Sequence, residues 1–167
     1  MDYEEKSRKK IRRVTNISRL NGWSILAVAG LSALVSLVLG HVFGVVIGCA
    51  VAVSGYFELR GHQRLVARKG GAVAWLVISQ WYLMIVLWSY CVINLYHFDS
   101  SNPWAMFSPR FKEFILAINP DAYLIESMLT VSYYATYISL ILAVFIYQGG
   151  LSLYYLSVKK YLYPKPL

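Results

Sequence analysis

The chain has 167 residues, of which 58% are hydrophobic and only 14% are charged, and its formal net charge is +8. Soluble domains contain about 25% charged residues, and a soluble fold this apolar would leave large sticky patches in water. Intrinsic disorder is excluded too, because disordered chains are poor in aromatic residues, whereas 16% of this chain is aromatic. The composition therefore predicts an integral membrane protein.

Residues 1–21 form a basic segment that precedes the first apolar run. Its apolar residues recur at helical spacing at Ile11, Val14 and Ile17, and its arginines lie on another face at Arg8, Arg12 and Arg19. This pattern predicts a basic amphipathic helix that binds anionic lipids of the inner leaflet. An alternative is a charge cluster that only sets orientation. Nucleic acid would require the same charges, but lipid is the nearer anion, so no nucleic-acid partner is expected.

Two apolar runs follow, at residues 22–40 and 42–59. A membrane-spanning helix needs about 20 mostly apolar residues. One helix covering both runs would be about 57 Å long, which is too long for a single crossing. We therefore predict two spans joined by a tight hairpin at Gly40 and His41, where glycine permits the turn. A signal peptide is disfavoured, because a second apolar run follows the first directly.

The second span carries a small residue at every fourth position: Gly40, Gly44, Gly48 and Ala52. Small residues allow membrane helices to approach closely. We expect this stripe to meet a second helix face, either within the hairpin or between subunits of a homo-oligomer. The matching stripe in the first span consists of Ser24, Val28, Ser32 and Ser36.

An ionisable cluster lies at the end of the second span and contains Glu58, Arg60, His62 and Arg64. Three interpretations are open: a structural salt bridge, a cytoplasmic gate, or a site for lipid headgroups. No ionisable residue is predicted at the centre of any span. Proton-driven carriers and voltage sensors place charges there, so neither class is expected.

The third and fourth spans are predicted at residues 72–95 and 129–158. Gln80 and Asn94 share one face of the third span. The fourth span presents a hydroxyl stripe of Ser132, Thr136 and Ser139. These polar side chains are candidates for interhelical hydrogen bonds or for the lining of a hydrated path.

The connection at residues 96–127 contains a second amphipathic helix. Ser108 and Pro109 form a helix-start signal, and Asn119-Pro120 repeats it before the fourth span. Apolar residues share one helical face at Phe111, Phe114, Ile115 and Ile118. The pattern predicts an outer cap helix, which acts as an aromatic anchor or as a lid over a pore or ligand site.

Basic residues concentrate in residues 1–21, in residues 60–69 and in the tail at 159–167, while the 96–127 connection carries acidic residues. With four crossings, the three basic segments share one side of the membrane, and the positive-inside rule makes that side cytoplasmic. We therefore expect both termini in the cytoplasm, with a bacterial inner membrane as the default location.

Taken together, these patterns predict an all-α four-transmembrane-helix bundle, with residues 22–158 as its membrane domain. The sequence has no zinc-protease, CxxC, Walker or nucleophile-elbow motif, so no enzyme activity, metal or cofactor is expected. A haem held by His41 and His97 is the weakest alternative. The leading hypothesis is a homo-oligomeric channel-like or transport-related protein, because the four helices of one chain enclose too little space for an aqueous path. The alternative is a non-transporting scaffold or accessory subunit that binds a membrane protein or lipid.

Overall fold

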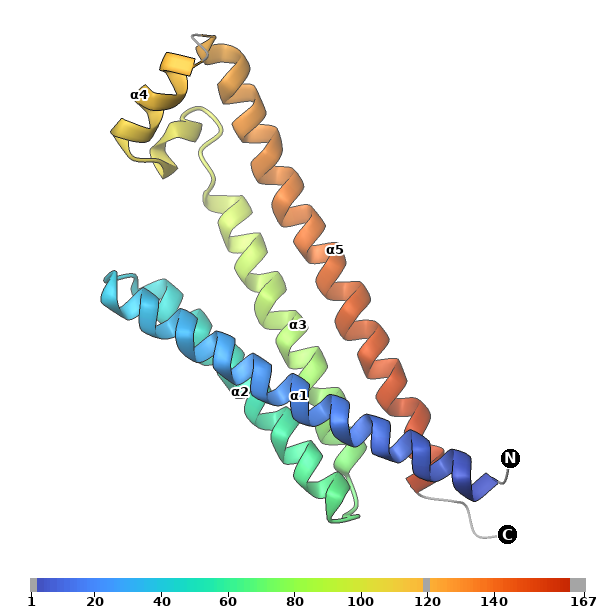
Figure 1. The fold of residues 1–167 in the computed structure, drawn as a ribbon. Helices are drawn as coiled ribbons and strands as arrows, with labels where there is room; N and C mark the ends of the chain where they lie inside the picture. Colours follow the sequence, from blue (N-terminus) through green and yellow to red (C-terminus); the bar gives the residue numbers. More distant parts are fainter. Residues whose placement is uncertain (1–2, 119–120, 163–167) are drawn as a thin grey trace. The chain divides into compact units, whose positions relative to one another are not determined.

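The computed structural model describes residues 3–118 and 121–162, and it contains helices but no strand within these ranges (Figure 1). Four helices are long and apolar enough to cross a membrane, as predicted. These are α1 (Tyr3–Val38), α2 (Val42–Val66), α3 (Ala72–His97) and α5 (Ala122–Leu162). Between α3 and α5 lie a short 3-10 helix, η1 (Pro103–Met106), and the helix α4 (Pro109–Ile118).

The first helix is longer than the sequence analysis predicts. The expected boundary at residue 21, between the basic segment and the first span, falls inside α1, which runs unbroken for 36 residues. A helix of that length measures about 54 Å. It contains no proline, and Gly22 is accommodated because α2 packs directly against it: a Cβ there would lie 2.8 Å from Leu59 Cδ2.

The predicted hairpin at Gly40 and His41 is present. The amide of His41 donates to the carbonyl of Ser36 (2.8 Å), and that of Gly40 donates to Leu37 (3.1 Å). Gly40 adopts a φ of 71°. These are the two bonds and the left-handed residue of a Schellman motif, which ends a helix and satisfies its last carbonyls. The turn thus directs α2 back along α1.

The chain divides into two compact units. The first unit comprises residues 1–87 and 144–167, and the second comprises residues 88–143. Helices α3 and α5 each contribute one part to the first unit and one part to the second. The two units are described separately below.

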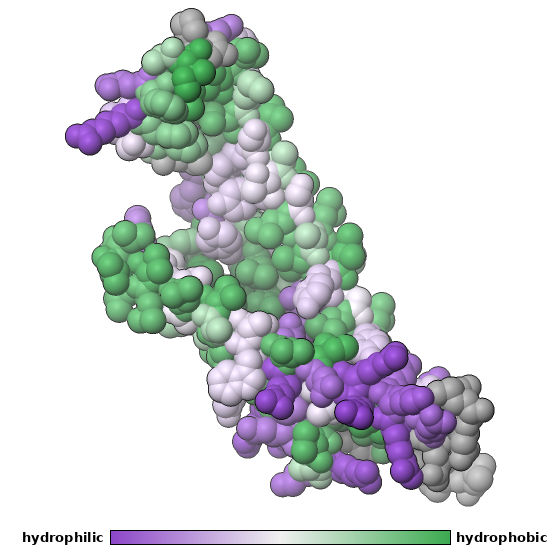
Figure 2. Space-filling view, in the orientation of Figure 1, coloured by the Kyte–Doolittle hydropathy of each residue, from purple (hydrophilic) through white to green (hydrophobic). Residues whose placement is uncertain are grey.

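The core of the first unit joins parts of four helices, and its buried members are Val14, Leu65, Ala72, Val73, Leu76, Tyr155 and Val158. Ile11 and Ile17 pack against this core. The apolar stripe of the basic segment therefore contacts protein, whereas the sequence analysis placed it on lipid. Figure 2 shows hydrophilic residues gathered where the N-terminal part of α1 lies, and hydrophobic residues around the α1–α2 turn.

In the second unit, helix α4 begins at Pro109, as predicted. The Phe111 amide lies 3.3 Å from the hydroxyl oxygen of Ser108, which accepts its hydrogen bond. Helix α5 begins seven residues before the predicted start of the fourth span, where Asp121 Oδ1 accepts the amide of Leu124 (3.0 Å). Asp121 is therefore the N-cap, while the predicted Asn119-Pro120 signal lies outside the described residues.

The loop before η1 is held by Asp99, whose Oδ1 accepts the hydroxyl (2.6 Å) and the amide (2.9 Å) of Ser101. These hydrogen bonds, led by that of the hydroxyl, hold the pKa of Asp99 below its usual value. Trp104 of η1 is buried, and its indole Nε1 donates to Glu126 Oε1 of α5 (2.8 Å). The hydrogen bond between Trp104 and Glu126 anchors the connection to α5.

Candidate functional site

Glu58 lies inside a long apolar helix. The second span is predicted to end at residue 59, but α2 continues to Val66. Glu58 is therefore four residues past the middle of this helix, and its exposed fraction is 0%. The structure thus buries an ionisable side chain near the predicted end of the second span. Ionisable groups inside membrane helices are costly and mark functional sites by default.

Two neutral donors hold the carboxyl group of Glu58. The Nε2 amide of Gln80, on α3, donates to Oε2, and the Tyr155 hydroxyl, on α5, donates to Oε1. Each donor–acceptor distance is 2.5 Å, and both donor residues are fully buried. Both carboxyl oxygens thus act as acceptors.

Glu58 has no basic partner in the described part of the chain. Arg60, its nearest basic neighbour in sequence, is exposed, and the predicted salt bridge within the cluster is not formed among the described residues. A buried charge without a counter-charge is unfavourable. The two hydrogen bonds offset part of that cost, because hydrogen bonds to ionised groups are roughly twice as strong as neutral ones.

Close packing of α1 against α2 seals one side of Glu58. A Cβ added to Gly22 of α1 would lie 3.3 Å from Glu58 Cγ. One added to Gly55 of α2 would lie 3.1 Å from the carbonyl oxygen of Gly22. Any larger residue would therefore force the helices apart. Glycine at these two positions allows the backbones to approach and excludes water from the carboxyl group.

The other members of the predicted cluster serve separate contacts. His62 Nδ1 lies 3.1 Å from the carbonyl oxygen of Thr15 and 3.3 Å from the hydroxyl of Ser18, which ties α2 to α1. Because a carbonyl can only accept, the His62 Nδ1 carries the proton in this contact. The guanidinium of Arg64 lies 5.6 Å from the ring centre of Trp75, a cation–π contact. In the structure, Glu58, His62 and Arg64 therefore each contact different residues.

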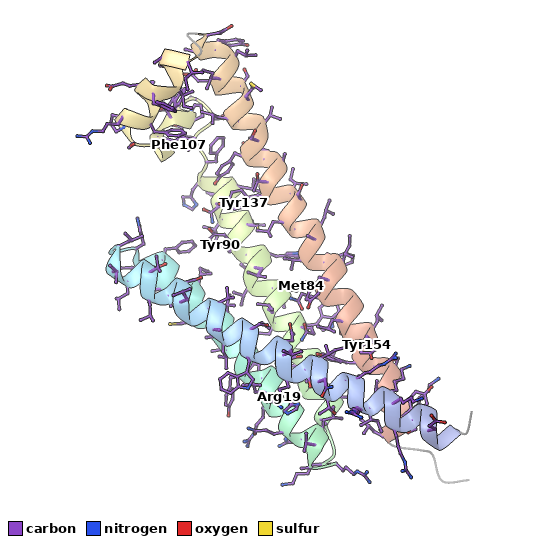
Figure 3. The ribbon with its side chains drawn as sticks, viewed as in Figure 1. Arg19, Met84, Tyr90, Phe107, Tyr137 and Tyr154 are labelled. Atoms are coloured by element: carbon purple, nitrogen blue, oxygen red, sulfur yellow. The ribbon has the colours of Figure 1, made fainter. Side chains whose placement is uncertain are left out.

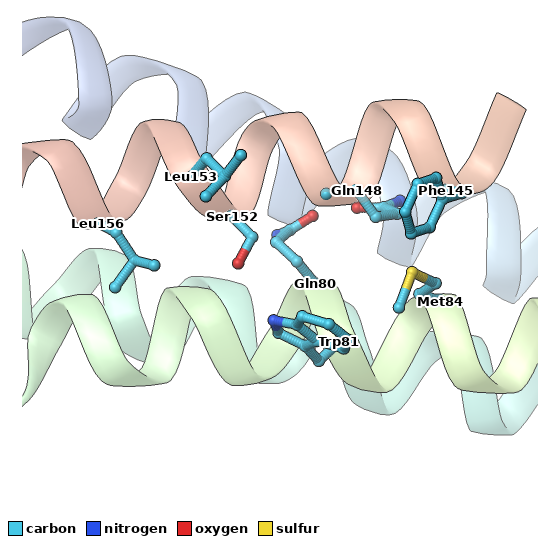
Figure 4. Close-up of a pocket in the computed structure, with 9 residues that line it drawn as sticks. Gln80, Trp81, Met84, Phe145, Gln148, Ser152, Leu153 and Leu156 are labelled. Atoms are coloured by element: carbon cyan, nitrogen blue, oxygen red, sulfur yellow. The ribbon is translucent and has the colours of Figure 1, made fainter.

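A cavity of about 230 Å³ lies beside Gln80, between α3 and α5 of the first unit (Figure 4). Its walls combine two amides and a hydroxyl with apolar side chains, and its lining residues are Gln80, Trp81, Met84, Phe145, Gln148, Gly149, Ser152, Leu153 and Leu156. The carbonyl oxygens of Gln80 and Gln148 are buried and have no hydrogen-bond partner among the described residues. The cavity therefore presents free acceptors within a mostly apolar wall.

The glycine stripe of α2 packs within the hairpin. A Cβ at Gly44 would contact Ser36, and one at Gly48 would lie 2.8 Å from the Cβ of Ala33. Gly40 lies in the turn, and Ala52 is half-buried. Of the α1 stripe predicted to meet these residues, only Ser36 makes such a contact. The other three, Ser24, Val28 and Ser32, are exposed.

The polar residues predicted on the third and fourth spans are divided between the two units. Gln80 belongs to the first unit. In the second unit, Asn94 Nδ2 donates to the Tyr90 carbonyl (2.8 Å), and the Thr136 hydroxyl donates to the Ser132 carbonyl (2.7 Å). Ser139 is exposed. Asn94 and Thr136 therefore bond to their own helices.

Tyrosines connect α3 to α5 in the second unit. The hydroxyl of Tyr133 donates to the carbonyl of Asn94 (3.0 Å). The rings of Tyr90 and Tyr137, labelled in Figure 3, have centroids 6.2 Å apart. Ser132 and Thr136 border a second cavity of about 300 Å³, which is otherwise lined mainly by aromatic and apolar side chains.

Sequence reasoning missed two residues of the site around Glu58, namely Tyr155 and Gln148. Tyr155 is one of many tyrosines whose expected place is an interfacial belt or an interhelical contact, and the predicted site contains neither residue. A signal for Gln148 was present, because the polar triplet Gln148-Gly149-Gly150 interrupts the long apolar run of the fourth span. The sequence offers no comparable signal for Tyr155, since the chain contains 14 tyrosines.

No protein-family model matches this chain, and no curated protein or solved structure matches it either.

Proposed function

We propose that this chain is a transport-related membrane protein in which Glu58 is the residue that handles the solute. The observation that carries the proposal is that Glu58 is fully buried, is held by two neutral donors and lacks a counter-charge in the described chain. A purely structural position would favour an apolar residue, because replacing buried charges by apolar side chains is often neutral or stabilising. Retention of an acid at this depth supports a role in handling a polar or cationic solute.

The mouth of the cavity beside Gln80 supports assembly of several copies. Two of its apolar lining residues, Trp81 and Leu153, are 52% and 69% exposed, so the cavity opens at the side of the first unit. A path limited to one four-helix bundle would be narrow, and a second copy would complete the wall. Since α1 covers Gly44 and Gly48, the contact between copies would use a different face.

The proposed orientation places both termini in the cytoplasm of a bacterial cell, with the N-terminal basic residues near anionic inner-leaflet lipids. The charge asymmetry along the sequence supports it. Reporter fusions at both ends provide the test. Cytoplasmic signals from both fusions would support the orientation, and signals from opposite sides would contradict it.

The test of function is solute flux through purified protein in liposomes. Wild type is compared with Glu58→Gln, which keeps the shape of the side chain and removes its charge. The matched control is Glu113→Gln, which changes an exposed glutamate of α4. We expect flux of a cation such as K⁺ or of protons in wild type and in the control, and a loss of at least tenfold in Glu58→Gln. Equal flux in all three proteins would contradict a working role for Glu58.

A second candidate function is that of a non-transporting scaffold. The observation in its favour is helix α4, which has no buried residue and exposes 61% of Phe114 and 68% of Ile118. This apolar face is suited to an outer cap that binds lipid or another membrane protein. Absence of flux over a range of ions and pH, together with co-purification of a defined partner that Phe114→Ser releases, would favour this function.

A further inference from the structure

The two unpartnered carbonyl oxygens in the cavity face each other. Figure 4 shows the amide oxygens of Gln80 and Gln148 turned toward one another from opposite walls. Gln80 is fully buried and Gln148 is 6% exposed, so bulk water does not solvate these oxygens. A buried polar atom without a hydrogen-bond partner costs about 1–3 kcal/mol, so each of these two oxygens favours the presence of a donor.

Glu58 fixes the orientation of the Gln80 amide. Its carboxyl oxygen accepts the Nε2 hydrogen bond, so the carbonyl oxygen of Gln80 must point away from Glu58. That oxygen points into the cavity that Gln80 lines. The carboxyl group of Glu58 therefore lies one amide group behind the cavity wall, where its ionised form would attract a cation.

We propose that this cavity binds the ammonium group of an amphiphilic amine. The N–H groups of the ammonium would donate to the carbonyl oxygens of Gln80 and Gln148, and Glu58 would supply the counter-charge. The apolar part of the amine would lie along Phe145, Leu153 and Leu156, which line the cavity and are partly exposed at its mouth. Trp81, also at the mouth, offers an aromatic face to a cation.

The size and position of the cavity fit this class of ligand. A volume of about 230 Å³ far exceeds the space that one water molecule requires. Gln80 lies eight residues after the start of α3, which corresponds to about 12 Å along the helix. An ammonium group entering from the lipid-water boundary on that side would reach it. The source is either the headgroup of an amine-bearing phospholipid or a free hydrophobic amine.

Binding of octylamine by the full-length protein in phosphatidylcholine nanodiscs tests the proposal. The measured quantity is the stabilisation against heat, which rises with ligand concentration when a ligand binds only the folded state. The comparison ligand is octyltrimethylammonium, which has the same charge but no N–H group. We expect octylamine to bind saturably and at least tenfold more tightly. Equal binding of the two ligands would overturn the proposal, because acceptor oxygens would then make no difference.

Two variants and one control localise the binding. Gln148→Leu removes one acceptor, and Gly149→Leu fills the cavity from a position where a Cβ meets no atom within 4 Å. Gly150→Leu is the matched control, since its Cβ is equally unhindered and Gly150 does not line the cavity. We expect at least tenfold weaker octylamine binding in both variants and unchanged binding in the control. Unchanged binding in Gln148→Leu and Gly149→Leu would overturn the proposal.

Native mass spectrometry distinguishes the two sources of the ammonium. Retention of one phosphatidylethanolamine per chain, in preference to phosphatidylcholine and lost in Gly149→Leu, would support a lipid headgroup as the ligand. Binding of octylamine without such retention would support a free amine. The inference rests on the proposed function only in taking Glu58 as the centre of the site. If octylamine binds but liposomes show no flux, the transport function is contradicted and the ammonium site is supported. If liposomes show flux but octylamine does not bind, the ammonium site is contradicted and the transport function is supported.

Discussion

The hydroxyl of Tyr155 lies 2.5 Å from a carboxyl oxygen of Glu58, although 97 residues separate the two in the chain. This contact joins α5 to α2 in the interior of the first unit, where neither side chain is exposed. The Tyr155 hydroxyl is one of two donors to the carboxyl group of Glu58, and the amide of Gln80 is the other. The position of α5 in the first unit is therefore coupled to a polar contact as well as to apolar packing.

Replacement of Tyr155 by phenylalanine should destabilise the protein. The change removes the donor to Glu58 Oε1 and retains the ring, so a buried acceptor loses its hydrogen bond, at a cost of about 1–3 kcal/mol. The free energy of unfolding, measured by denaturant titration in mixed micelles, is the relevant quantity. Tyr147→Phe removes a hydroxyl from a side chain that is 59% exposed and is the control. Similar losses in both variants would show that the contact with Glu58 contributes nothing specific.

Replacement of Gly48 by alanine should weaken the α1–α2 hairpin within a single chain. The added Cβ would lie 2.8 Å from the Cβ and 3.1 Å from the Cα of Ala33, so α1 itself must move. Overpacking of this kind costs about 1–3 kcal/mol. The opposite sign is expected for Gly30→Ala, where no atom lies within 4 Å, because alanine is about 0.8–1 kcal/mol better than glycine inside a helix.

These two variants also distinguish a hairpin contact from a contact between copies. Unfolding free energy and oligomer mass are measured on the same samples. If Gly48→Ala lowered the oligomer mass and left the unfolding free energy unchanged, the glycine stripe would join separate chains in the membrane, and the packing against Ala33 would not be its main use.

The number and the type of the membrane helices were predictable because they depend on local sequence. A run of apolar residues is long enough to span, and glycine at position 40 provides the left-handed residue that ends α1. The start of α4 at Pro109 follows from the same kind of local signal. Such features need no knowledge of distant contacts.

The site was harder to predict, because its partners are far apart in sequence. Because a charged residue sets the predicted limit of the second span, the sequence places Glu58 at a boundary. Its burial depends on Gln80 and Tyr155, which only the fold brings together. Only Ser36 of the predicted α1 stripe meets the glycine stripe within the hairpin, for a geometric reason. Residues four apart advance by about 400° on a helix of 3.6 residues per turn, which is about 40° more than one full turn. Over the three such steps from Ser24 to Ser36 the excess reaches about 120°, so these two residues do not share one face.

The N-terminal part of α1 should stay folded on the protein in the absence of anionic lipid. Val14 is fully buried against residues of the first unit, so protein contacts hold this segment. Hydrogen exchange of residues 8–20 is expected to be equally slow in neutral and anionic nanodiscs, and faster in Val14→Ala. Leu20→Ala, at a position 71% exposed, is the control. Protection that requires anionic lipid in the wild type would instead favour an interfacial helix.

Removal of the indole N–H of Trp104 should loosen the connection between α3 and α5. Trp104→Phe deletes the hydrogen bond to Glu126 Oε1 and keeps most of the buried aromatic surface, so local opening should become easier by about 1.5–3 kcal/mol. Faster hydrogen exchange in residues 99–118, with the first unit unaffected, is the expected readout. Trp23→Phe, at a site 61% exposed, provides the comparison, and identical exchange in both variants would refute the role of this bond.

Replacement of Arg68 by glycine should stabilise the protein. Arg68 has a φ of 51°, a left-handed conformation that costs a non-glycine residue about 1–2 kcal/mol. It stands one residue beyond Ala67, the C-cap of α2, where glycine is preferred. The same substitution at Arg60, inside the helix, should destabilise by about 1 kcal/mol because glycine is a poor helix former. Unfolding free energies in mixed micelles should thus change in opposite directions, and a loss of stability in Arg68→Gly would mean that the charge of Arg68 outweighs its backbone strain.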